Sequence, residues 1–285
     1  MIDRPAPPSR RLRIVHLFPD LLSVYGDAGN VRTLVARASW RGIEVDVATV
    51  VGDSPSVPEA DVLVIGGGQD RDQAQVERAL RRLGDPILAA VADGAALLAV
   101  CGGYQSLGIE YRTREGLSIR GPGILDVRTV AGQDRLVGPV VAKIALPDVD
   151  AARPTIVGFE NHSGRTTLGE SSTPFAFVEV GHGNNDEDGT EGLIEQPGVR
   201  GLRGLRIGTY LHGPFLPRNP HVADLLIAAG LRRTGQGDVL EPLDDQAEWA
   251  AHDRFVAVTR RRPWMARLPS RIQRATNPAR NLIGF

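Results

Sequence analysis

The stretch that decides the fold is Ala95–Gly108, AALLAVCGGYQSLG. An apolar run leads into Cys101, the single cysteine in 285 residues, and two glycines and a helix-like segment follow it. This order predicts a buried strand that turns sharply into a helix, with a nucleophilic thiol at the turn. The helix N-terminus beneath the thiol favours its thiolate form. The alternative is a structural cysteine at the end of a core strand, but the adjacent glycines favour the nucleophile.

The first half of the chain alternates strand and helix patterns. Asn30 is expected to cap the first helix, and Pro86 to open a separate helix after Gly84. This alternation predicts an α/β fold with a mostly parallel central sheet flanked by helices. The glycines at Gly66–Gly68 and after Cys101 both follow strands, so we expect them to face one crevice at the carboxyl ends of the strands. The expected strands are 11–18, 43–51, 61–68 and 95–100, and the expected helices are 31–42, 75–84 and 86–93.

The second half of the chain is β-rich. Short strand-like runs are expected at 117–121, 136–146, 154–164 and 175–180, and one more buried strand ends near His212. Residues 181–192 are polar and are expected to form a surface loop, and residues 219–233 are expected to form a helix. These patterns predict an N-terminal extension (1–10), one domain (11–236) and an Arg-rich C-terminal tail (237–285). The tail is interpreted as a solvated appendage or as a docking segment for a partner or an anionic membrane.

The composition excludes several classes of function. A formal net charge of −1 gives no reason to expect nucleic acid as a partner. One cysteine cannot form an internal disulfide, and the N-terminal residues lack the apolar core of a signal peptide, so a cytoplasmic location is expected. No Cys/His cluster predicts a metal site, and no GxxxxGK[ST] loop predicts an ATP site in this chain. The sequence therefore gives no reason to expect ATP or Mg²⁺ to bind to this chain.

A cysteine nucleophile needs a base, and the chain has six histidines. His162 and His212 each follow a buried strand and precede a glycine, and GTYLHGPF, which contains His212, is the cleaner case. Backbone N–H groups could bind the oxyanion: Gly102 supplies one, and Gly67 or Gly68 the second. Of the other histidines, His16 is expected to be structural and His182 to lie at a polar loop. His221 and His252 are expected to be surface residues.

Six stretches of this sequence together resemble the class I glutamine amidotransferases, in their cobyric-acid-synthase-like branch. The resemblance covers residues 11–235 and implies the class I amidotransferase fold. The stretches are YGDAGN (Tyr25–Asn30), VIGGGQDRDQ (Val64–Gln73), VCGGYQ (Val100–Gln105), QDRLVGPV (Gln133–Val140), GFENHSGRT (Gly158–Thr167) and GTYLHGPF (Gly208–Phe215).

The resemblance implies a role for each candidate site residue. Cys101 would attack the side-chain amide of L-glutamine, and His212 would protonate the departing ammonia, leaving a thioester that water hydrolyses. Arg135 matches the position that holds the glutamine substrate, and a guanidinium can grip its α-carboxylate bidentately. His162 is reduced to positioning a loop or contacting substrate. Most class I members carry His-x-Glu, but proline occupies the +2 position here, so the group that orients His212 must come from elsewhere in the chain, from the backbone or from a partner.

Within this branch the similarity is to small amidotransferase subunits that deliver ammonia to a MurT-like, ATP-dependent ligase subunit. The resemblance implies no cofactor in this chain and places ATP and Mg²⁺ on that partner. The resemblance implies that this partner amidates the α-carboxyl of D-glutamate in the lipid II stem peptide, at the inner face of the membrane, as a step in peptidoglycan biosynthesis. Two alternatives remain open. The chain could serve another acceptor, such as a corrinoid carboxylate, or it could be a regulatory relative without catalysis.

Overall fold

The computed structural model describes residues 10–22, 26–68, 73–145 and 153–261. Its centre is an eleven-stranded sheet, of which five strands run parallel in the order β2-β1-β3-β4-β11. Strands β3, β4 and β11 are buried along their whole length, as expected for parallel strands covered on both faces. The parallel sheet predicted from the sequence is thus confirmed. These strands are β1 (Arg11–Leu17), β2 (Glu44–Val50), β3 (Val62–Ile65), β4 (Ala96–Val100) and β11 (Arg206–Thr209).

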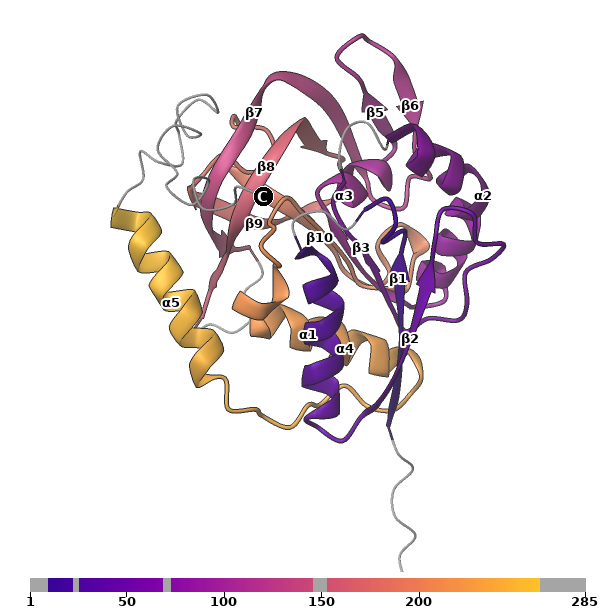
Figure 1. Ribbon diagram of the computed structural model, residues 1–285, viewed down its shortest axis with the longest axis vertical. Coiled ribbons are helices and arrows are strands. Elements are labelled where there is room, and N and C mark those ends of the chain that lie inside the picture. Colours follow the sequence, from indigo (N-terminus) through magenta and orange to yellow (C-terminus); the bar gives the residue numbers. More distant parts are fainter. Residues whose placement is uncertain (1–9, 23–25, 69–72, 146–152, 262–285) are drawn as a thin grey trace, which may run out of the picture.

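Helices cover both faces of the parallel strands. The chain leaves β1 toward one edge through α1 and leaves β3 toward the other edge through α2, so right-handed crossovers place these two helices on opposite faces. Helix α4 packs beside α1 (Figure 1). None of the helices in the described part of the chain combines the length and the apolar character needed to cross a bilayer. The helices are α1 (Ala28–Ser39), α2 (Gln73–Ala92), α3 (Gly102–Ser106), α4 (Pro220–Arg233) and α5 (Gln246–Arg261), with 3-10 turns η3 (Val199–Gly201) and η4 (Leu216–Arg218).

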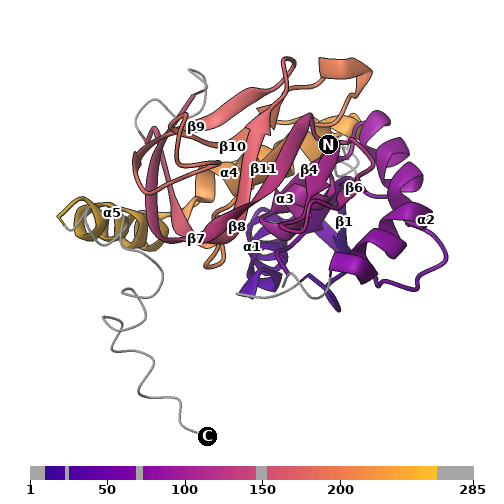
Figure 2. The same cartoon turned by 90° about the horizontal axis from the view of Figure 1, so that it is seen from above.

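The second half of the chain extends the sheet with mostly antiparallel strands, as Figure 2 shows beyond β11. The order continues β10-β9-β7-β5-β6, and β8 pairs with β7 in a long hairpin. This confirms the β-rich second half. The strands are β5 (Glu110–Arg112), β6 (Ser118–Arg120), β7 (Val127–Ile144), β8 (Thr155–Leu168), β9 (Thr173–Val180) and β10 (Thr190–Glu195).

Two expected helix boundaries were wrong. The cap of α1 is Asp27 rather than Asn30, which lies buried inside the first turn. Residues 73–92 form one helix, α2, with Pro86 inside it. The apolar stripe of α2 explains this continuity, because the buried positions 76, 80, 83, 87 and 91 follow helical spacing through the proline. Packing of this face against the sheet therefore outweighs the hydrogen bond that Pro86 cannot donate.

The polar segment 181–192 is not the simple surface loop that its composition indicates. Asn184 and Glu191 are completely buried. The Asn184 side chain accepts a hydrogen bond from the Gly192 N–H at 3.0 Å and from the Tyr104 hydroxyl at 3.3 Å, and it donates to the Gly192 carbonyl. Because the loop and Asn184 satisfy each other's polar groups, a polar sequence folds inward here.

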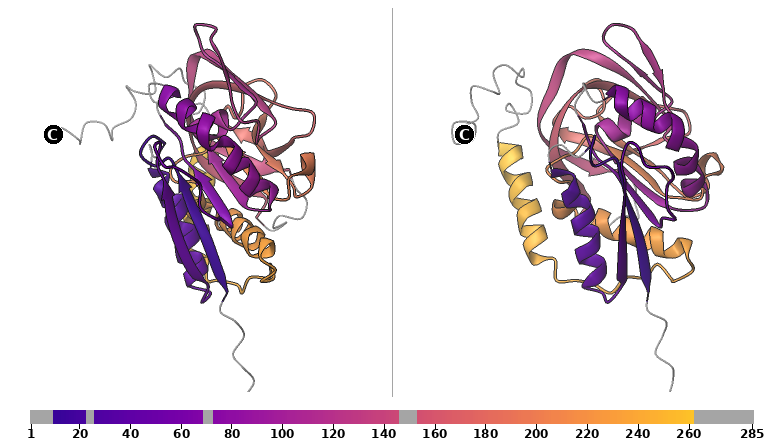
Figure 3. Two further views of the ribbon diagram at one scale, coloured as in Figure 1. Left: turned by 90° about the vertical axis from the view of Figure 1, so that its right-hand side faces the viewer. Right: turned by 45° about the vertical axis from the view of Figure 1, so that its right-hand side comes forward.

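Residues 237–261, the part of the expected tail that the structure describes, are not a solvated appendage. They run past α1 and end in α5, an outer helix that packs on β7, β8 and η4 (Figures 1 and 3). His252 on α5 is buried, with its ring nitrogens 2.8 Å from the Thr155 hydroxyl and 2.7 Å from the Arg218 carbonyl. His221 stacks on Trp249 of α5. The expectation that both histidines are surface residues was therefore wrong. Residues 262–285 lie outside the described part of the chain.

One buried arginine ties α1, α4 and the start of α5 together. The Arg37 guanidinium bonds both carboxylate oxygens of Asp224 at 2.7 Å and those of Asp245 at 2.6 and 2.9 Å. Arg37 is 1% exposed. A charge so deeply buried is stable only because two carboxylates neutralise it and satisfy its donors.

We expect Arg37→Ala to lower the free energy of unfolding by about 3 kcal/mol, because it removes the cation that Asp224 and Asp245 share and leaves only Asp224 paired, with Arg41. The value sits at the low end for a broken buried pair because the carboxylate side chains retain 25% and 17% exposure. Urea unfolding measures the loss. Arg81→Ala is the matched control, since Arg81 forms an exposed pair with Glu77 and should cost under about 0.5 kcal/mol. Equal losses of unfolding free energy in the two variants would show that Arg37 does not hold α1, α4 and the start of α5 together.

Candidate active site

Cys101 sits at the sharp turn between β4 and α3. Its backbone has φ 49° and ψ −103°, a combination that residues with a side chain rarely adopt. Such strain costs on the order of 1–3 kcal/mol and persists only where the surroundings hold it. The Cys101 N–H donates to the Thr209 carbonyl at 2.8 Å, and the Gly103 N–H donates to the Gly66 carbonyl at 3.0 Å. Strand-end contacts on both sides therefore hold the turn predicted from the sequence.

His212 lies beyond the end of β11, and β8 fixes its backbone. The His212 N–H donates to the Phe159 carbonyl at 2.9 Å, and the Phe159 N–H donates back to the His212 carbonyl at 3.2 Å. The imidazole meets the thiol over Gly67. A Cβ atom placed on Gly67 would lie 2.5 Å from Cε1 of His212 and 3.1 Å from Cβ of Cys101. The two side chains thus converge on one point, and only glycine fits between them.

The carboxylate of Asp27 completes the group. Asp27 Oδ1 is 3.3 Å from Nδ1 of His212, and Asp27 Oδ2 accepts the N–H of Gly67 at 2.6 Å. Asp27 is fully buried at the start of α1, yet its side chain makes no capping bond to its own helix. The group that orients His212 therefore comes from elsewhere in this chain, one of the three sources that the sequence left open. The signal was an aspartate at a helix start inside YGDAGN, a residue to which sequence reasoning gave no role.

Gly29 and Asn30, from the same stretch, hold the loop that follows His212. A Cβ atom on Gly29 would lie 2.4 Å from Cγ of Pro214, so only glycine lets this loop rest on α1. The Asn30 side chain accepts the Leu216 N–H at 2.9 Å. The start of α1 is thus a platform for the histidine loop, and both sides of the Asp27–His212 contact are fixed.

The charge state of His212 follows from these neighbours. Burial by itself would lower the pKa of His212, but the charges and hydrogen bonds of Cys101 and Asp27 outweigh it and raise the pKa well above its ordinary value. The raised pKa favours the protonated form of His212. A cation beside the thiol is the setting in which a cysteine acts as a thiolate nucleophile.

His162 lies in the core rather than beside the thiol. Its ring stacks on Tyr210 with centroids 3.5 Å apart, and its Nδ1 is 2.8 Å from the Gly164 carbonyl. Burial holds its pKa well below the usual value. Since a neutral histidine packed in this way cannot also serve as the acid beside Cys101, the geometry favours His212 for that role.

The N–H groups expected to bind an oxyanion are only partly available. The Gly67 N–H is committed to Asp27 and does not support the role expected of it. The alternative, Gly68, lies beside the turn, because a Cβ atom on Gly102 would be 3.0 Å from the Gly68 nitrogen. Within the described residues, the N–H groups of Gly68 and Gly102 donate to no protein acceptor. Gly102, at the start of α3, and Gly68, after β3, together have the donors that a tetrahedral oxyanion needs.

Arg135 lies on β7, in the same hairpin whose other strand fixes His212. Its Nε donates to the Asn161 side-chain oxygen at 2.9 Å, and its Nη2 donates to the Asn161 carbonyl at 2.8 Å. Burial is the main cause of the lowered pKa of His162, and the positive charge of Arg135 makes a smaller contribution in the same direction. The structure thus brings Arg135 into the region of the catalytic group but gives it no direct contact with Cys101 among the described residues.

Two buried carboxyl groups that sequence reasoning missed lie behind the histidine. Burial raises the pKa of Glu160 to about 7 and that of Glu191 to about 7. Glu160 accepts the N–H groups of His182 and Gly183 at 2.8 and 2.9 Å. Glu191 accepts the Thr209 hydroxyl at 2.6 Å and the Tyr210 N–H at 2.9 Å. Glu191 therefore braces the strand end that leads to His212, and Glu160 holds the turn at residues 182–183.

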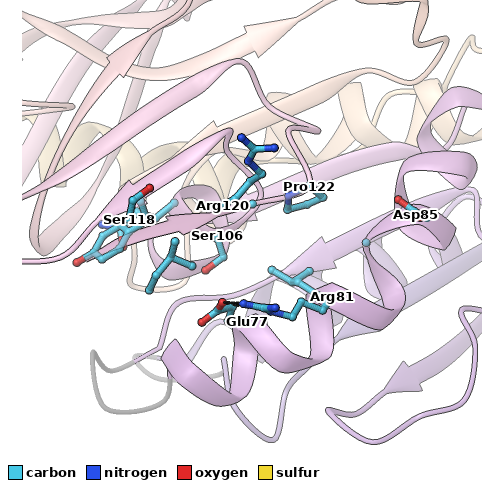
Figure 4. A pocket seen from close by; sticks show the side chains of 13 residues that line it. Glu77, Arg81, Asp85, Ser106, Ser118, Arg120 and Pro122 are labelled. Carbon is cyan, nitrogen blue, oxygen red and sulfur yellow. Dashed lines mark hydrogen bonds and ion pairs between the residues drawn. The ribbon is translucent and has the colours of Figure 1, made fainter. Parts of the chain in front are cut away.

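A pocket of about 430 Å³ lies on the other side of α3, between α2 and the β5–β6 hairpin. Figure 4 shows Ser106 directed toward α2, where Glu77 and Arg81 form an ion pair. Gln105 also lines this pocket, while its Nε2 donates to the Tyr210 hydroxyl at 3.1 Å. Cys101 and His212 do not line it. The described residues contain no group of three or more His, Cys, Asp or Glu side chains that could hold a metal ion.

Comparison with known proteins agrees with this geometry. The CobB/CobQ-like glutamine amidotransferase domain matches residues 13–220. The chain is 39% identical over 243 residues to the lipid II isoglutaminyl synthase (glutamine-hydrolyzing) subunit GatD of Staphylococcus aureus, covering 83% of this chain and 91% of that protein. It is 34% identical to the subunit of the same name from Streptococcus pneumoniae, covering 81% and 85%. A cobyric acid synthase of Limosilactobacillus reuteri is 31% identical over 54% of this chain and 29% of that protein.

The domain match covers most of the chain and contains Asp27, Cys101 and His212, the three side chains that converge in the structure. The sheet, apart from the first two residues of β1, and the strained cysteine turn also lie inside it. This protein belongs to the CobB/CobQ-like glutamine amidotransferase family.

Proposed function

We propose that this chain is the glutamine-hydrolysing subunit of a lipid II isoglutaminyl synthase. The convergence of Cys101, His212 and Asp27 carries the proposal, because it supplies a nucleophile, an acid–base and an orienting carboxylate in one buried group. Two relatives at 39% and 34% identity bear this subunit name and match over most of their length.

The chemistry begins at the thiolate of Cys101, which attacks the side-chain amide carbon of L-glutamine. The carbonyl oxygen becomes an oxyanion and receives hydrogen bonds from the N–H groups of Gly102 and Gly68. The carbon–nitrogen bond then breaks, and the His212 imidazolium donates its proton to the departing nitrogen. Ammonia leaves, and a γ-glutamyl thioester remains on Cys101.

Hydrolysis of the thioester restores the enzyme. His212, now neutral, takes a proton from a water molecule that attacks the thioester carbonyl. The carbon–sulfur bond breaks, L-glutamate leaves, and the thiolate again faces a protonated imidazole. Asp27 keeps Nδ1 of His212 as the hydrogen-bonded nitrogen throughout, so Nε2 is the nitrogen that exchanges protons with the reacting groups.

The ammonia is delivered to a MurT-like ligase subunit, which binds ATP and Mg²⁺ and amidates the α-carboxyl of D-glutamate in the lipid II stem peptide. Lipid II contacts the complex through that partner, at the inner face of the membrane. Protonated ammonia is no nucleophile, so direct passage to the partner protects the product. The partner should therefore dock over the crevice that contains Cys101 and His212.

Transfer of labelled nitrogen tests this function. The chain is co-purified with a Mur-ligase-like subunit and supplied with amide-¹⁵N-glutamine, ATP and lipid II, and the stem peptide is examined by mass spectrometry. We expect ¹⁵N in isoglutamine. A stable complex that releases labelled ammonia but leaves lipid II unlabelled would indicate another acceptor. A chain that stays monomeric and hydrolyses glutamine at full rate would be a free-standing glutaminase.

Cys101→Ser should abolish glutamine hydrolysis and leave the fold intact, because a serine hydroxyl is far less acidic than a thiol. Ammonia release from glutamine measures activity, and the unfolding midpoint checks the fold. Treatment of the unmodified chain with diazo-oxo-norleucine, an alkylating glutamine analogue, should give one adduct, on Cys101. Activity well above background in the pure serine variant would exclude Cys101 as the nucleophile.

His212→Ala should lower turnover at least ~10²-fold, the usual effect of losing a general acid–base. His162→Ala should cost less, because His162 packs on Tyr210 and not on the thiol. Steady-state ammonia release compares the two variants. If His162→Ala lowers turnover more than His212→Ala does, the acid–base role belongs to His162 instead.

Asp27→Asn should shift the alkaline limb of the pH–rate profile to lower pH. The carboxylate is one cause of the raised pKa of His212, so without it the imidazolium loses its proton at a lower pH and cannot protonate ammonia. Turnover should also fall by ~10-fold or more because the ring loses its orienting bond. Asp20→Asn is the control: Asp20 is exposed and bonds the Gly52 N–H. An unshifted limb in Asp27→Asn would remove Asp27 from the catalytic group.

A further inference from the structure

The strand that contains Arg135 is interrupted by a bulge. Ala131 of β7 pairs with Gly164 of β8, and Leu136 pairs with His162. Four residues of β7, 132–135, therefore face the single residue Ser163 on β8. A bulge bends its strand and changes the direction in which its side chains point. Arg135 is the last residue of this bulge.

Two other arginines hold the backbone of the bulge. Nη2 of Arg114 donates to the carbonyls of Gly132 and Gln133 at 3.1 and 3.0 Å. Arg165 donates to the Asp134 carbonyl at 3.2 Å and to the Ser163 carbonyl at 2.9 Å. The carbonyls that a bulge leaves without ladder partners are thus taken up by guanidinium groups. The bulge is a fixed part of the structure rather than a loose interruption of the strand.

The Arg135 guanidinium is itself held by Asn161. Its Nε bonds the side-chain oxygen at 2.9 Å and its Nη2 bonds the main-chain oxygen at 2.8 Å, so one edge of the planar group is fixed at two points. Both residues are half-buried. Two bonds to one edge set the plane and the direction of a group that would otherwise sample many rotamers.

Asn161 also links Arg135 to the catalytic histidine. It lies two residues after Phe159, whose backbone exchanges two hydrogen bonds with His212. Alternate residues of a strand share one face, so Phe159 and Asn161 point the same way from β8. One short segment of β8 therefore sets the position of both His212 and the Arg135 guanidinium.

We propose that Asn161 is a positioning residue that holds Arg135 in the orientation that receives the α-carboxylate of L-glutamine. The inference rests on the glutaminase function proposed above. In this arrangement, recognition of the free α-carboxylate belongs to Arg135 and Asn161 acting together. Asn161 itself takes no part in the cleavage of the amide.

The test compares two substrates that differ only at the α-carboxylate, L-glutamine and L-glutamine methyl ester. The full chain is used, together with its partner subunit where turnover needs it, and ammonia release is measured. Arg135→Ala should lower kcat/KM for glutamine ~10- to 100-fold, chiefly through KM, because a charge-assisted bidentate contact is lost. Asn161→Ala should lower it ~3- to 10-fold in the same way, since the arginine remains but is no longer oriented. Neither substitution should change kcat/KM for the methyl ester.

The double variant separates positioning from a general structural role. If Asn161 acts through Arg135, then Arg135→Ala with Asn161→Ala should be no worse than Arg135→Ala alone. Asn185→Ala is the matched control. Asn185 is also half-buried and bonds the Thr166 carbonyl at 3.1 Å and Asp188 at 2.7 Å, so its loss should leave the glutamine-to-ester ratio unchanged. Thermal unfolding of each variant confirms that it is folded.

The possible failures are distinguishable. Equal losses on both substrates in Asn161→Ala, or full additivity with Arg135→Ala, would overturn the positioning role while leaving the glutaminase in place. If the unmodified complex prefers glutamine over the methyl ester and neither substitution changes this preference, the positioning role is also overturned while the glutaminase remains. An unmodified chain that releases no ammonia from either substrate, with or without its partner, would contradict the proposed function and this inference together.

Discussion

The buried carboxylate of Asp27 joins the three segments on which the site depends. One oxygen meets the imidazole of His212 and the other accepts the N–H of Gly67. An isolated charge at this depth would be very unfavourable, so the two contacts and the positive end of α1 that surrounds it are needed for it to exist at all. The order of the site therefore follows from the need to satisfy one anion, which fixes the start of α1, the end of β3 and the histidine loop relative to one another.

Local patterns in the sequence were enough to predict much of this arrangement. The parallel strands are short apolar runs, and their glycine-rich ends had to meet at one edge of the sheet, which placed Gly67 beside Cys101. The turn at Cys101 follows from an apolar run that ends at a cysteine and two glycines. The role of His212 could also be predicted from a local pattern, since it follows a buried strand directly and precedes Gly213, whose φ is 120°.

The parts that could not be predicted depend on contacts between distant residues. Asp27 and His212 are separated by 185 positions, and an aspartate before a helix normally indicates a cap. Asn184 and Glu191 belong to a polar segment, and composition cannot show that the segment supplies its own partners. The charge of residues 237–261 indicated solvent exposure, whereas Arg37 and His252 anchor that segment on the domain. In each case the deciding partner lies on another element.

The single cysteine has a consequence for behaviour under oxidising conditions. A thiol beside an imidazolium is readily oxidised by any peroxide that reaches it, and Cys101 is 5% exposed. Elsewhere, a sulfenic acid is often protected when a neighbouring cysteine closes a disulfide with it. This chain has no second thiol to do so. If the chain has the function proposed above, oxidation would remove its nucleophile at once, and recovery would require a small thiol from outside. The proposed supply of ammonia would then depend on the reducing capacity of the surrounding solution.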